Sequence, residues 1–433
     1  MADLTTGKIA EVMFDSFVET YEHQAVMVDL IDAESPDEAK LQNSGNLIWY
    51  PVQQHRPILS GFDLTGQEQG IIEETVPISL GDPNGDFIDQ RIDNMRDMRF
   101  WDRAGKQAMQ QQITQLNSDL ARLVVNTGSQ FFRYDTAVTA SGFDFCTEGQ
   151  TRLDEQEIYD NNGRCFLLNP RDHRAFASDL AGRQTLGSKA DRSENAYATG
   201  NIGEYVASFD IYQGSFLPTL AGGASPDATV TATVSLKPEA GAVDAATGDV
   251  SNVDYRRGSI PVADSSAYNI GDKVSFLNGA VAVTAIGLAS KEDSGRAMTF
   301  TVVAKPNSKT IEVFPKPIAL DDPALTALEK AYANIDTQIA SGAVVSRLNV
   351  DAEAKTNIFW AKDSIKMIGG DAPWQLMKEF SGKKVLSATA KDGMQMYMIY
   401  DGDIAKATFQ YRLFFWYGLS NFNPMANGVG VTF

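Results

Sequence analysis

The sequence contains few of the residues on which catalysis and covalent crosslinking usually depend. Its 433 residues include three histidines and two cysteines, Cys146 and Cys165. Two cysteines cannot build a disulfide framework for a chain of this length, so we expect a reducing, intracellular folding environment. The histidines, His23, His55 and His173, stand at no spacing typical of a zinc site. We therefore expect no metal and no histidine-dependent acid–base centre.

Short motifs for nucleotide and acyl chemistry are missing as well. The sequence has no G-x-G-x-x-G after a strand, no phosphate-binding G-x-x-x-x-G-K-[ST] loop and no G-x-S-x-G elbow. A stretch from Asp82 to Asp93 alternates oxygen-bearing side chains as a calcium loop does, but Phe87 occupies the position that needs glycine. We interpret it as a turn before a helix, with Asp86 as N-cap and Asp89 near the positive helix end. We expect no cofactor and no enzyme activity.

Positive charge and long apolar runs are also scarce. The 37 Lys and Arg residues face 56 Asp and Glu residues, for a net charge of −19, which disfavours nucleic-acid binding over the whole surface. No apolar run reaches about 18 residues, so we expect no membrane span. The N-terminal segment lacks a basic leader and a small-residue cleavage site, and we expect no secretory signal.

The first regular pattern is an amphipathic helix from about Leu4 to His23. Apolar residues such as Phe17 recur at helical spacing, and acidic residues, Asp15 and Glu19 among them, lie on another face. Such an acidic face is either simply solvated or a docking strip for a basic partner.

A β segment and a long helix follow. LIWYPVQQ predicts a strand, and residues 51–86 predict a two-stranded excursion that needs a neighbouring surface to be stable. From Phe87 to about Asn126 the apolar residues share one helical face, which predicts a helix close to 40 residues long. A coiled coil is the alternative, but its heptad pattern fails around Gly105 to Gln112.

The remainder predicts a mixed α/β host with a β-rich insert. CFLLNP predicts a buried strand and Pro170 to Leu180 a helix, whereas residues 219–318 are rich in Ala, Gly, Val, Thr and Ser and contain alternating runs. Beyond them we expect a helix from Pro323 to Ala340 and then strands in TNIFWAKDSIKMI, MQMYMIYD, RLFFWYGL and GVGVTF. The fold class is therefore α+β, with an all-β insert.

Within these elements, a series of short segments follows in a specific order. They are IWYPVQQ, GFDLTG, GDPNGDF, EVFPKPIALDD, AYANI, TNIFWAKDSIKMI, WYGL and GVGV. The series resembles the coat proteins of phage P22 and its relatives, short-tailed bacteriophages, over nearly the whole chain. The resemblance implies an HK97-type major capsid fold with these parts: an N-arm (1–47), an E-loop (48–86), a P-domain spine helix (87–135), a first A-domain and P-domain part (136–218), an inserted I-domain (219–340), and a second A-domain and P-domain part (341–433).

The resemblance also implies sites of protein–protein contact. The scaffolding protein would bind Asp15 and Glu19, with Ser16 where relatives can carry a further acid. The family's D-loop, which contacts a neighbouring copy across a twofold axis, corresponds to about Val243 to Arg257. Its charged candidates are Asp244, Asp249, Asp254 and Arg256, and their possible partners are Asp82, Arg99, Asp102 and Arg103. Relatives have a basic residue where this chain has Asp102, so individual ion pairs would be rewired.

As a function, the resemblance implies a major capsid protein that assembles with scaffolding protein into the pentamers and hexamers of an icosahedral procapsid. A portal protein would occupy one vertex, and the shell would enclose double-stranded DNA without sequence-specific binding. Assembly is expected in the host bacterial cytoplasm, and the product is the virion capsid. Two alternatives from other classes are a secreted β-rich adhesin or carbohydrate-binding protein and a hydrolase with an acidic dyad.

Overall fold

The structure is a computed structural model, and it describes most of the chain. The described residues are 6–35, 46–52, 55–66, 68, 70–91, 98–134, 142–158, 163–182, 206–222, 227–240, 242–243, 250–251, 254–349, 354–370, 384–390, 392–403, 405–406 and 408–432. The chain forms two compact units. The first comprises Met1–Ile48, Pro77–Leu120 and Ile365–Ser420, and the second comprises Trp49–Val76, Ala121–Ser364 and Asn421–Phe433.

The first unit begins with helix α1 (Thr6–Gln24), which confirms the helix expected over residues 4–23. Ala10, Met13 and Phe17 lie on its buried face, whereas Asp15 and Glu19 are exposed. The short 3-10 helix η1 (Val28–Leu30) follows. The amphipathic pattern read from the sequence is therefore used as expected, with the apolar side turned into the core.

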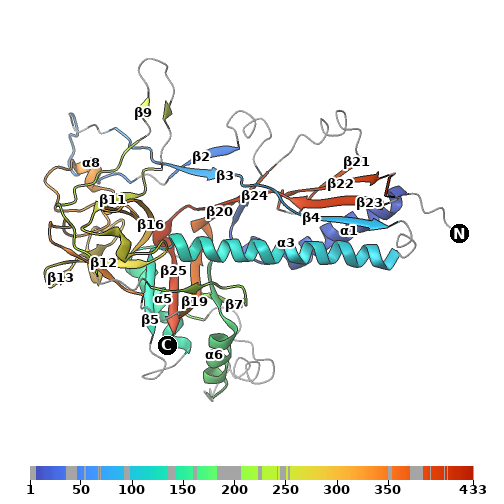
Figure 1. Cartoon of the computed structure of the whole chain (residues 1–433). Helices are drawn as coiled ribbons and strands as arrows, with labels where there is room; N and C mark the ends of the chain where they lie inside the picture. The colour runs from blue at the N-terminus through green and yellow to red at the C-terminus, as the bar shows by residue number, and fades with distance from the viewer. Residues whose placement is uncertain are drawn as a thin grey trace. The chain divides into compact units, whose positions relative to one another are not determined.

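Strands from distant parts of the chain form the main sheet of the first unit. Its order is β21 (Lys384–Thr389), β22 (Gln395–Asp403), β23 (Thr408–Phe415) and β4 (Asn84–Arg91), and all neighbouring pairs are antiparallel (Figure 1). Strands β22 and β23 confirm the strands expected in MQMYMIYD and RLFFWYGL. Residues 396–398 of β22 and 413–415 of β23 are buried in succession, so both faces of the sheet are covered there.

Strand β4 corrects the expected start of the long helix. Phe87 pairs with Arg412 and Asp86 with Leu413, so Asp86 is not a helix N-cap and Asp89 is not at a helix end. Exposed and half-buried residues alternate along β4, and Ile88 faces the same side as Asp86. This alternation of burial fits a strand, and pairing with β23 decides between the two interpretations.

The long helix itself, α3, extends over Met98–Thr127, or 30 residues. At 1.5 Å per residue this is about 45 Å, shorter than the roughly 60 Å that 40 residues would span. Its buried residues include Trp101, Ala108, Leu116 and Leu120, spaced seven, eight and four residues apart. A continuous proline-free helix is thus confirmed, with a later start than predicted.

A three-stranded sheet completes the first unit. Its order is β1 (Asp32–Glu34), β20 (Ile365–Gly369) and β24 (Tyr417–Asn421), with β1 and β20 parallel. Lys366 of β20 forms ion pairs with Asp32 and Glu34 of β1, at 3.2 and 2.8 Å. Nearby, the Trp416 indole N–H donates to the carbonyl oxygen of Gly81.

The second unit contains a mixed sheet of the strands β5 (Gln130–Tyr134), β25 (Asn427–Thr432), β19 (Ala354–Ala361), β6 (Arg164–Leu168) and β7 (Asp210–Gln213), in that order, with β8 (Thr219–Leu220) also on β19. Helices α5 (Gly142–Glu155) and α6 (Pro170–Gly182) accompany it. Phe132, Phe145, Phe166 and Phe359 pack together in a core cluster. The strands predicted in CFLLNP, TNIFWAKDSIKMI and GVGVTF and the helix from Pro170 are confirmed.

Residues between 228 and 347 form a β-rich part with a core of its own. Strands β11 (Gly258–Pro261), β17 (Thr310–Phe314), β16 (Phe300–Asn307), β12 (Lys273–Asn278) and β13 (Val281–Ala282) are neighbours in that order, and β18 (Val344–Arg347) also pairs with β12. A separate pair joins β14 (Thr284–Ile286) and β15 (Asp293–Ala297). The buried core cluster consists of residues from Ala228 to Val345. The runs DKVSFLN, AMTFTVVA and KTIEVFP are strands, as predicted.

Two expectations for this part are wrong. The run TVTATVSL makes isolated bridges at Thr229 and Val230 rather than a regular strand. The helix expected from Pro323 to Ala340 is one turn long, α8 (Ala327–Lys330), capped by Thr326. The remaining short elements are β2 (Leu47–Pro51) paired with β3 (Thr75–Ser79), β9 (Ala242–Val243) paired with β10 (Val250–Ser251), and the 3-10 helices η3 (Ser265–Ala267), η4 (Lys362–Ser364) and η5 (Pro424–Ala426).

Candidate functional site

The acidic residues predicted to bind a partner lie on one exposed face of α1. Glu11, Asp15, Glu19 and Glu22 are all exposed and are spaced four, four and three residues apart. Within the described residues, neither Asp15 nor Glu19 has a cationic group within 4.0 Å. Residues at this spacing share one side of a helix. Four carboxylates on that side form a negative surface, which we call the acidic strip.

Ser16 points away from the acidic strip. Its side chain is buried, and its hydroxyl donates to a carboxylate oxygen of Asp102 in α3 at 2.5 Å. Asp102 also accepts from Lys106 at 3.1 Å. These two hydrogen bonds lower the pKa of the Asp102 carboxyl. Asp102 therefore joins α1 to α3, a role that its place in the sequence did not indicate.

The other possible D-loop partners lie near one another in sequence and are exposed. Arg99 and Arg103 stand on the outside of the first turns of α3, where the Arg103 Nε donates to the Arg99 carbonyl oxygen at 3.2 Å. Asp82 is exposed before β4. Their exposure leaves all three accessible to another molecule.

Two of the four candidate D-loop residues, Asp254 and Arg256, lie in the part of the chain that the structure describes. Asp244 and Asp249 lie outside the described residues, between the paired strands β9 and β10. Asp254 and Arg256 are close together, since the Arg256 Nε and Nη2 donate to the two Asp254 carboxylate oxygens at 2.9 and 3.0 Å. The Arg256 Nη1 donates to the carbonyl oxygens of Asn421 and Phe422 at 2.6 and 3.0 Å.

Arg256 is consequently an internal residue of this subunit. It is 8% exposed, and its guanidinium also stacks over the Phe314 ring at 4.9 Å. A buried guanidinium that is bonded on all sides holds its neighbours in place, and removing it would take this donor away from the carbonyl groups of Asn421 and Phe422. The arginine's sequence context, after a Gly- and Asp-rich turn region, indicated an exposed position instead.

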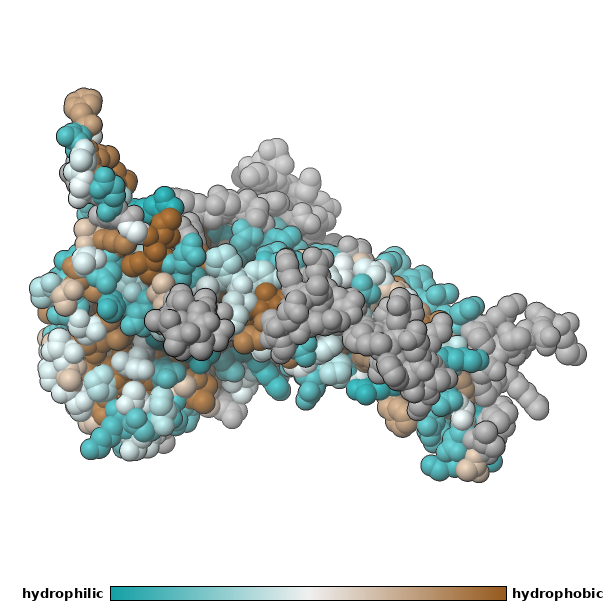
Figure 2. Space-filling view, turned by 90° about the horizontal axis from the view of Figure 1, so that it is seen from above, coloured by the Kyte–Doolittle hydropathy of each residue, from teal (hydrophilic) through white to brown (hydrophobic). Residues whose placement is uncertain are grey.

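A segment that we call the loop arm, residues 55–72, carries an unusual number of exposed apolar side chains. Ile58 is 96% exposed and Phe62 fully exposed, and Leu59, Leu64 and Ile71 also face solvent. These five account for half of the ten large apolar residues that are exposed in the described part of the chain. The face shown in Figure 2 is mainly teal and white, with brown apolar groups in scattered patches. Exposed apolar groups gathered in one segment are typical of a contact surface.

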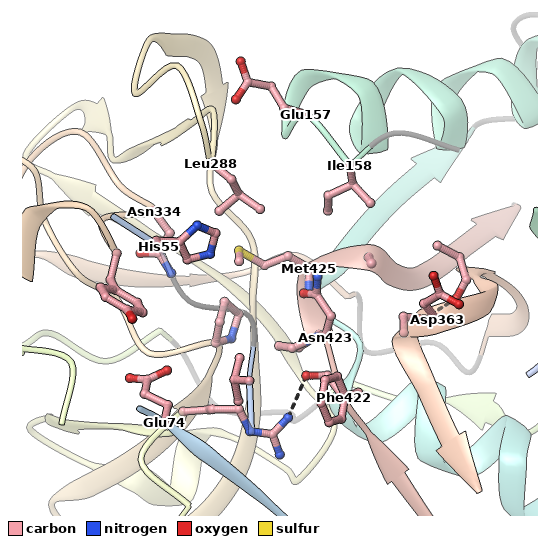
Figure 3. Close-up of a pocket in the computed structure, with 18 of the residues that line it drawn as sticks. His55, Glu74, Glu157, Ile158, Leu288, Asn334, Asp363, Phe422, Asn423 and Met425 are labelled. Carbon is pink, nitrogen blue, oxygen red and sulfur yellow. Dashed lines mark hydrogen bonds between the residues drawn. The ribbon is translucent and has the colours of Figure 1, made fainter. Parts of the chain in front are cut away.

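The root of the loop arm borders a pocket inside the second unit. The pocket has a volume of about 540 Å³. Figure 3 shows His55, Glu74 and Asn334 on one side of it, Phe422, Asn423 and Met425 across from them, and Glu157, Ile158 and Leu288 at another edge. Sequence analysis gave no signal for this pocket, because its residues come from segments that are more than 350 positions apart.

Tyr332 connects the two ends of the loop arm at this pocket. Its hydroxyl donates to the Ile72 carbonyl oxygen at 2.7 Å. The Tyr332 and His55 rings are 5.4 Å apart at 89°, an edge-to-face contact. Burial, together with the charge of Lys291, lowers the pKa of His55. The imidazole is thus held as a neutral ring at neutral pH.

Glu74 stands at the base of the loop arm beside a group of charged residues. Burial raises the pKa of its carboxyl to about 7, although the nearby Lys316 and Arg256 favour the charged form. Lys316 is itself buried and forms an ion pair with Glu239 at 3.6 Å. The ionisable groups of the pocket therefore face one another and the main chain, an arrangement that stabilises the junction between the loop arm and the β-rich part.

A second internal junction joins the β-rich part to the end of α3. Lys273 of β12 is completely buried, and its ammonium donates to the carbonyl oxygens of Val125 and Gly128 and to the Thr301 hydroxyl, at 2.7, 2.5 and 2.8 Å. Burial lowers the pKa of Lys273 to about 7. Three acceptors match the three donors of an ammonium group, and the C-terminal end of a helix attracts a cation.

Other kinds of site were sought in the part of the chain that the structure describes. No group of three or more His, Cys, Asp and Glu side chains there is arranged to hold a metal ion. No described helix combines the length and apolar character needed to cross a membrane. Cys146 and Cys165 are buried thiols, and burial raises the pKa of Cys146 to about 12, which keeps it protonated and unreactive.

Comparison with known proteins covers the whole chain. Residues 1–432 match the family model described as P22 coat protein, gene protein 5. Among solved structures, the chain is similar to one from Mycobacterium phage Che8 (9% identity, TM-score 0.41, covering 92% of this chain and 88% of that one) and to the capsid of cyanophage P-SCSP1u (10%, TM-score 0.46, 93% and 86%). It is also similar to the mature capsid of bacteriophage PhiM1 (8%, TM-score 0.44, 94% and 86%).

The family match agrees with the resemblance in the short sequence segments, and the observed helices and sheets confirm the predicted mixed α+β fold class. The family is one of structural capsid proteins and not a class of enzymes. Its members assemble with copies of themselves. This chain belongs to the P22 coat protein family and is a major capsid protein of a tailed bacteriophage.

Proposed function

We propose that this capsid protein assembles with a scaffolding protein into the pentamers and hexamers of an icosahedral procapsid in the cytoplasm of the host bacterium. The procapsid holds a portal protein at one vertex and later encloses double-stranded DNA. A net charge of −19 supports a shell that confines DNA without adhering to it. The observation that carries the proposal is the acidic strip of α1, an exposed row of carboxylates next to a buried apolar face.

The scaffolding protein docks on the acidic strip, with Asp15 and Glu19 at its centre. A basic helix on the partner would gain charge-assisted contacts with both residues, and the strip would speed the encounter between the two proteins. Because Ser16 is buried against Asp102, it contributes to the position of the helix and not to the docking surface.

The inserted domain and the D-loop are further parts of the proposal. Residues 219–340 act as an I-domain, which the separate core of residues 228–345 supports. Contacts between subunits across a twofold axis are made by Asp244 and Asp249. Asp254 and Arg256 support these contacts from within, since they bond to each other and to the main chain. Arg99, Arg103 and Asp82 are exposed and are suitable partners.

The loop arm supplies the apolar contact between neighbouring copies. It extends between the paired strands β2 and β3, and its solvent-facing Ile58 and Phe62 are stabilised only when another surface covers them. The repeated contact is weak in each copy, and the closed shell sums it over all copies.

Electron microscopy and sedimentation of the chain, expressed with and without its scaffolding protein, test the proposal. We expect uniform closed shells with the scaffolding protein and aberrant particles without it. An Asp15→Ala variant is expected to lose most scaffold binding while its unfolding midpoint stays unchanged, because Asp15 is exposed. Asp89→Ala, which removes the same charge from exposed β4, is the matched control. A chain that remains a monomer under both conditions would refute the proposal.

A further inference from the structure

The two ends of the loop arm are held by one side chain. Tyr332 follows the single turn of α8 in the β-rich part, and its hydroxyl donates to the carbonyl oxygen of Ile72 at one end of the loop arm. Its ring makes an edge-to-face contact with the ring of His55 at the other end. Tyr332 thus holds together the two ends of the 18-residue loop arm, and we call this pair of contacts the clasp.

The rest of the loop arm provides little restraint on its direction. Its residues 58–66, 68, 70 and 71 are exposed, and the hydrogen bonds from the N–H and hydroxyl of Thr65 to Asp63 are local to the turn. Local bonds shape a turn without tying it to another element. The direction in which the loop arm leaves the subunit is therefore decided at its root.

A small change at the root becomes a large displacement at the apolar tip. From residue 55 to residue 63, an extended chain reaches up to about 26 Å at about 3.3 Å per residue. A rotation of about 10° at the root would move such a tip by about 4 to 5 Å. Apolar contacts weaken when the gap opens by about 1 Å, so a displacement of this size would abolish the original contact.

Glu74 provides a second, chemically different tether at the same root. Its carboxyl lies near Lys316 and Arg256. Val52 donates its N–H to the Glu74 carbonyl oxygen at 2.9 Å, which pairs the two chains just before they enter the loop arm. Both tethers end on the β-rich part, in residues 256–332.

From these contacts we infer that Tyr332 is a positioning residue for assembly. It fixes the angle at which the loop arm leaves the β-rich part and thereby the angle between neighbouring copies, which determines the diameter of the shell. The part that concerns shell diameter rests on the proposed function of the loop arm as a contact between copies. The part that concerns the angle of the arm stands on the subunit alone.

Tyr332→Phe removes the hydrogen bond of the clasp and keeps the ring, and Tyr268→Phe is its matched control. The Tyr268 hydroxyl also bonds to the main chain within the β-rich part, accepting from Ala228 at 2.9 Å and donating to Val345 at 2.7 Å, but it does not touch the loop arm. The two variants therefore lose the same chemistry at different places. Because Tyr268 is more deeply buried than Tyr332, Tyr268→Phe should lower the free energy of unfolding at least as much as Tyr332→Phe does.

Two measurements on the full chain separate the parts of the inference. Hydrogen exchange of the unassembled subunit should show the Val52 amide, which bonds to the Glu74 carbonyl oxygen at the root, exchanging about three- to tenfold faster in Tyr332→Phe, because the root then has one hydrogen bond less. Tyr268→Phe should leave this amide unchanged. Electron microscopy of shells formed with scaffolding protein should show a broadened distribution of diameters for Tyr332→Phe and a single diameter for Tyr268→Phe.

Unchanged exchange at Val52 in Tyr332→Phe would overturn the clasp. Faster exchange with shells of the wild-type diameter would overturn the link between arm angle and shell size. Equal broadening in both variants would also overturn it, because general loss of stability would then explain the effect. If the wild-type chain forms no shells, the proposed function fails, and the exchange result still decides the clasp.

Discussion

Replacing Gly105 by alanine tests the packing of α1 on α3. A Cβ atom at Gly105 would lie 2.3 Å from the carbonyl oxygen of Met13 in α1, and 3.2 Å from the Met13 carbonyl carbon. Atoms at that distance overlap, so one of the helices must shift. Since the obstructing atom belongs to the main chain, no rotation of the Met13 side chain can relieve the clash.

Two opposite effects decide the magnitude of this change. In an exposed helix interior, alanine is better than glycine by about 1 kcal/mol. Forcing extra volume into a packed contact costs about 1 to 3 kcal/mol, and the upper part of this range applies here because main-chain atoms move least easily. We therefore expect Gly105→Ala to lower the free energy of unfolding by about 1 to 2 kcal/mol, although helix propensity alone predicts a gain.

Urea unfolding of the unassembled subunit, followed by tryptophan fluorescence, measures the change. Trp101 is completely buried one turn from Gly105 and reports on this contact. Gln107→Ala, an exposed site two residues further along α3, is the control and should shift the unfolding free energy by less than about 0.5 kcal/mol. A Gly105→Ala variant that is more stable than the wild type would show that propensity dominates and that α1 does not rest on Gly105.

Three further changes test the junctions of the second unit. Lys273→Met leaves the Val125 carbonyl without a donor and should cost about 2 kcal/mol in thermal or urea unfolding. Folded Lys273 loses its proton near pH 7, whereas the unfolded chain keeps it until about pH 10.5, so wild-type stability should rise across this window and the variant should lack that rise. Glu74 should give the opposite pH dependence, and Glu74→Gln tests it. The folded Glu74 carboxyl keeps its proton up to about pH 7, whereas the unfolded one keeps it only up to about pH 4.5, so wild-type stability should fall as the pH rises through this window. The variant should be more stable than wild type at pH 8, on the order of 2 kcal/mol, and equal to it at pH 4, and a constant difference at both pH values would contradict the assignment. Phe62→Ser should change the unfolding free energy by less than about 0.5 kcal/mol because the ring is exposed, yet it should reduce shell formation in sedimentation, and normal shells would argue against the apolar contact of the loop arm.

Elements that bury one face in a regular pattern were predictable from the sequence. Helix α1 places Met13, Phe17 and Tyr21 inward at spacings of four residues, and strand β6 is a short, continuous apolar run. Each of these patterns is contained within 20 residues and favours one secondary structure by itself. The ordered series of short segments likewise identified the family without any structure.

Interpretations based on local pattern failed where two structures fit the same spacing. By its spacing in the sequence, Ile88 extends the apolar face of the long helix, but residues 84–91 pair with β23 instead. Residues 323–340 have good helix formers, yet their chain is pinned by contacts such as Asn334 with the main chain of Lys316 and Ile318. Hydrogen bonds and packing to distant segments outweigh helix propensities that differ by less than about 1 kcal/mol per residue.

The sequence by itself therefore determined the class of fold, the acidic strip and the family. Only the tertiary structure decided which side chains share a site. His55, Arg256 and Tyr332 meet at the root of the loop arm although they stand about 80 to 280 positions apart, and Lys273 reaches the end of a helix about 150 residues earlier. Local periodicity states which face of an element is buried, whereas the partner that buries it depends on contacts across the whole chain, which no local pattern encodes.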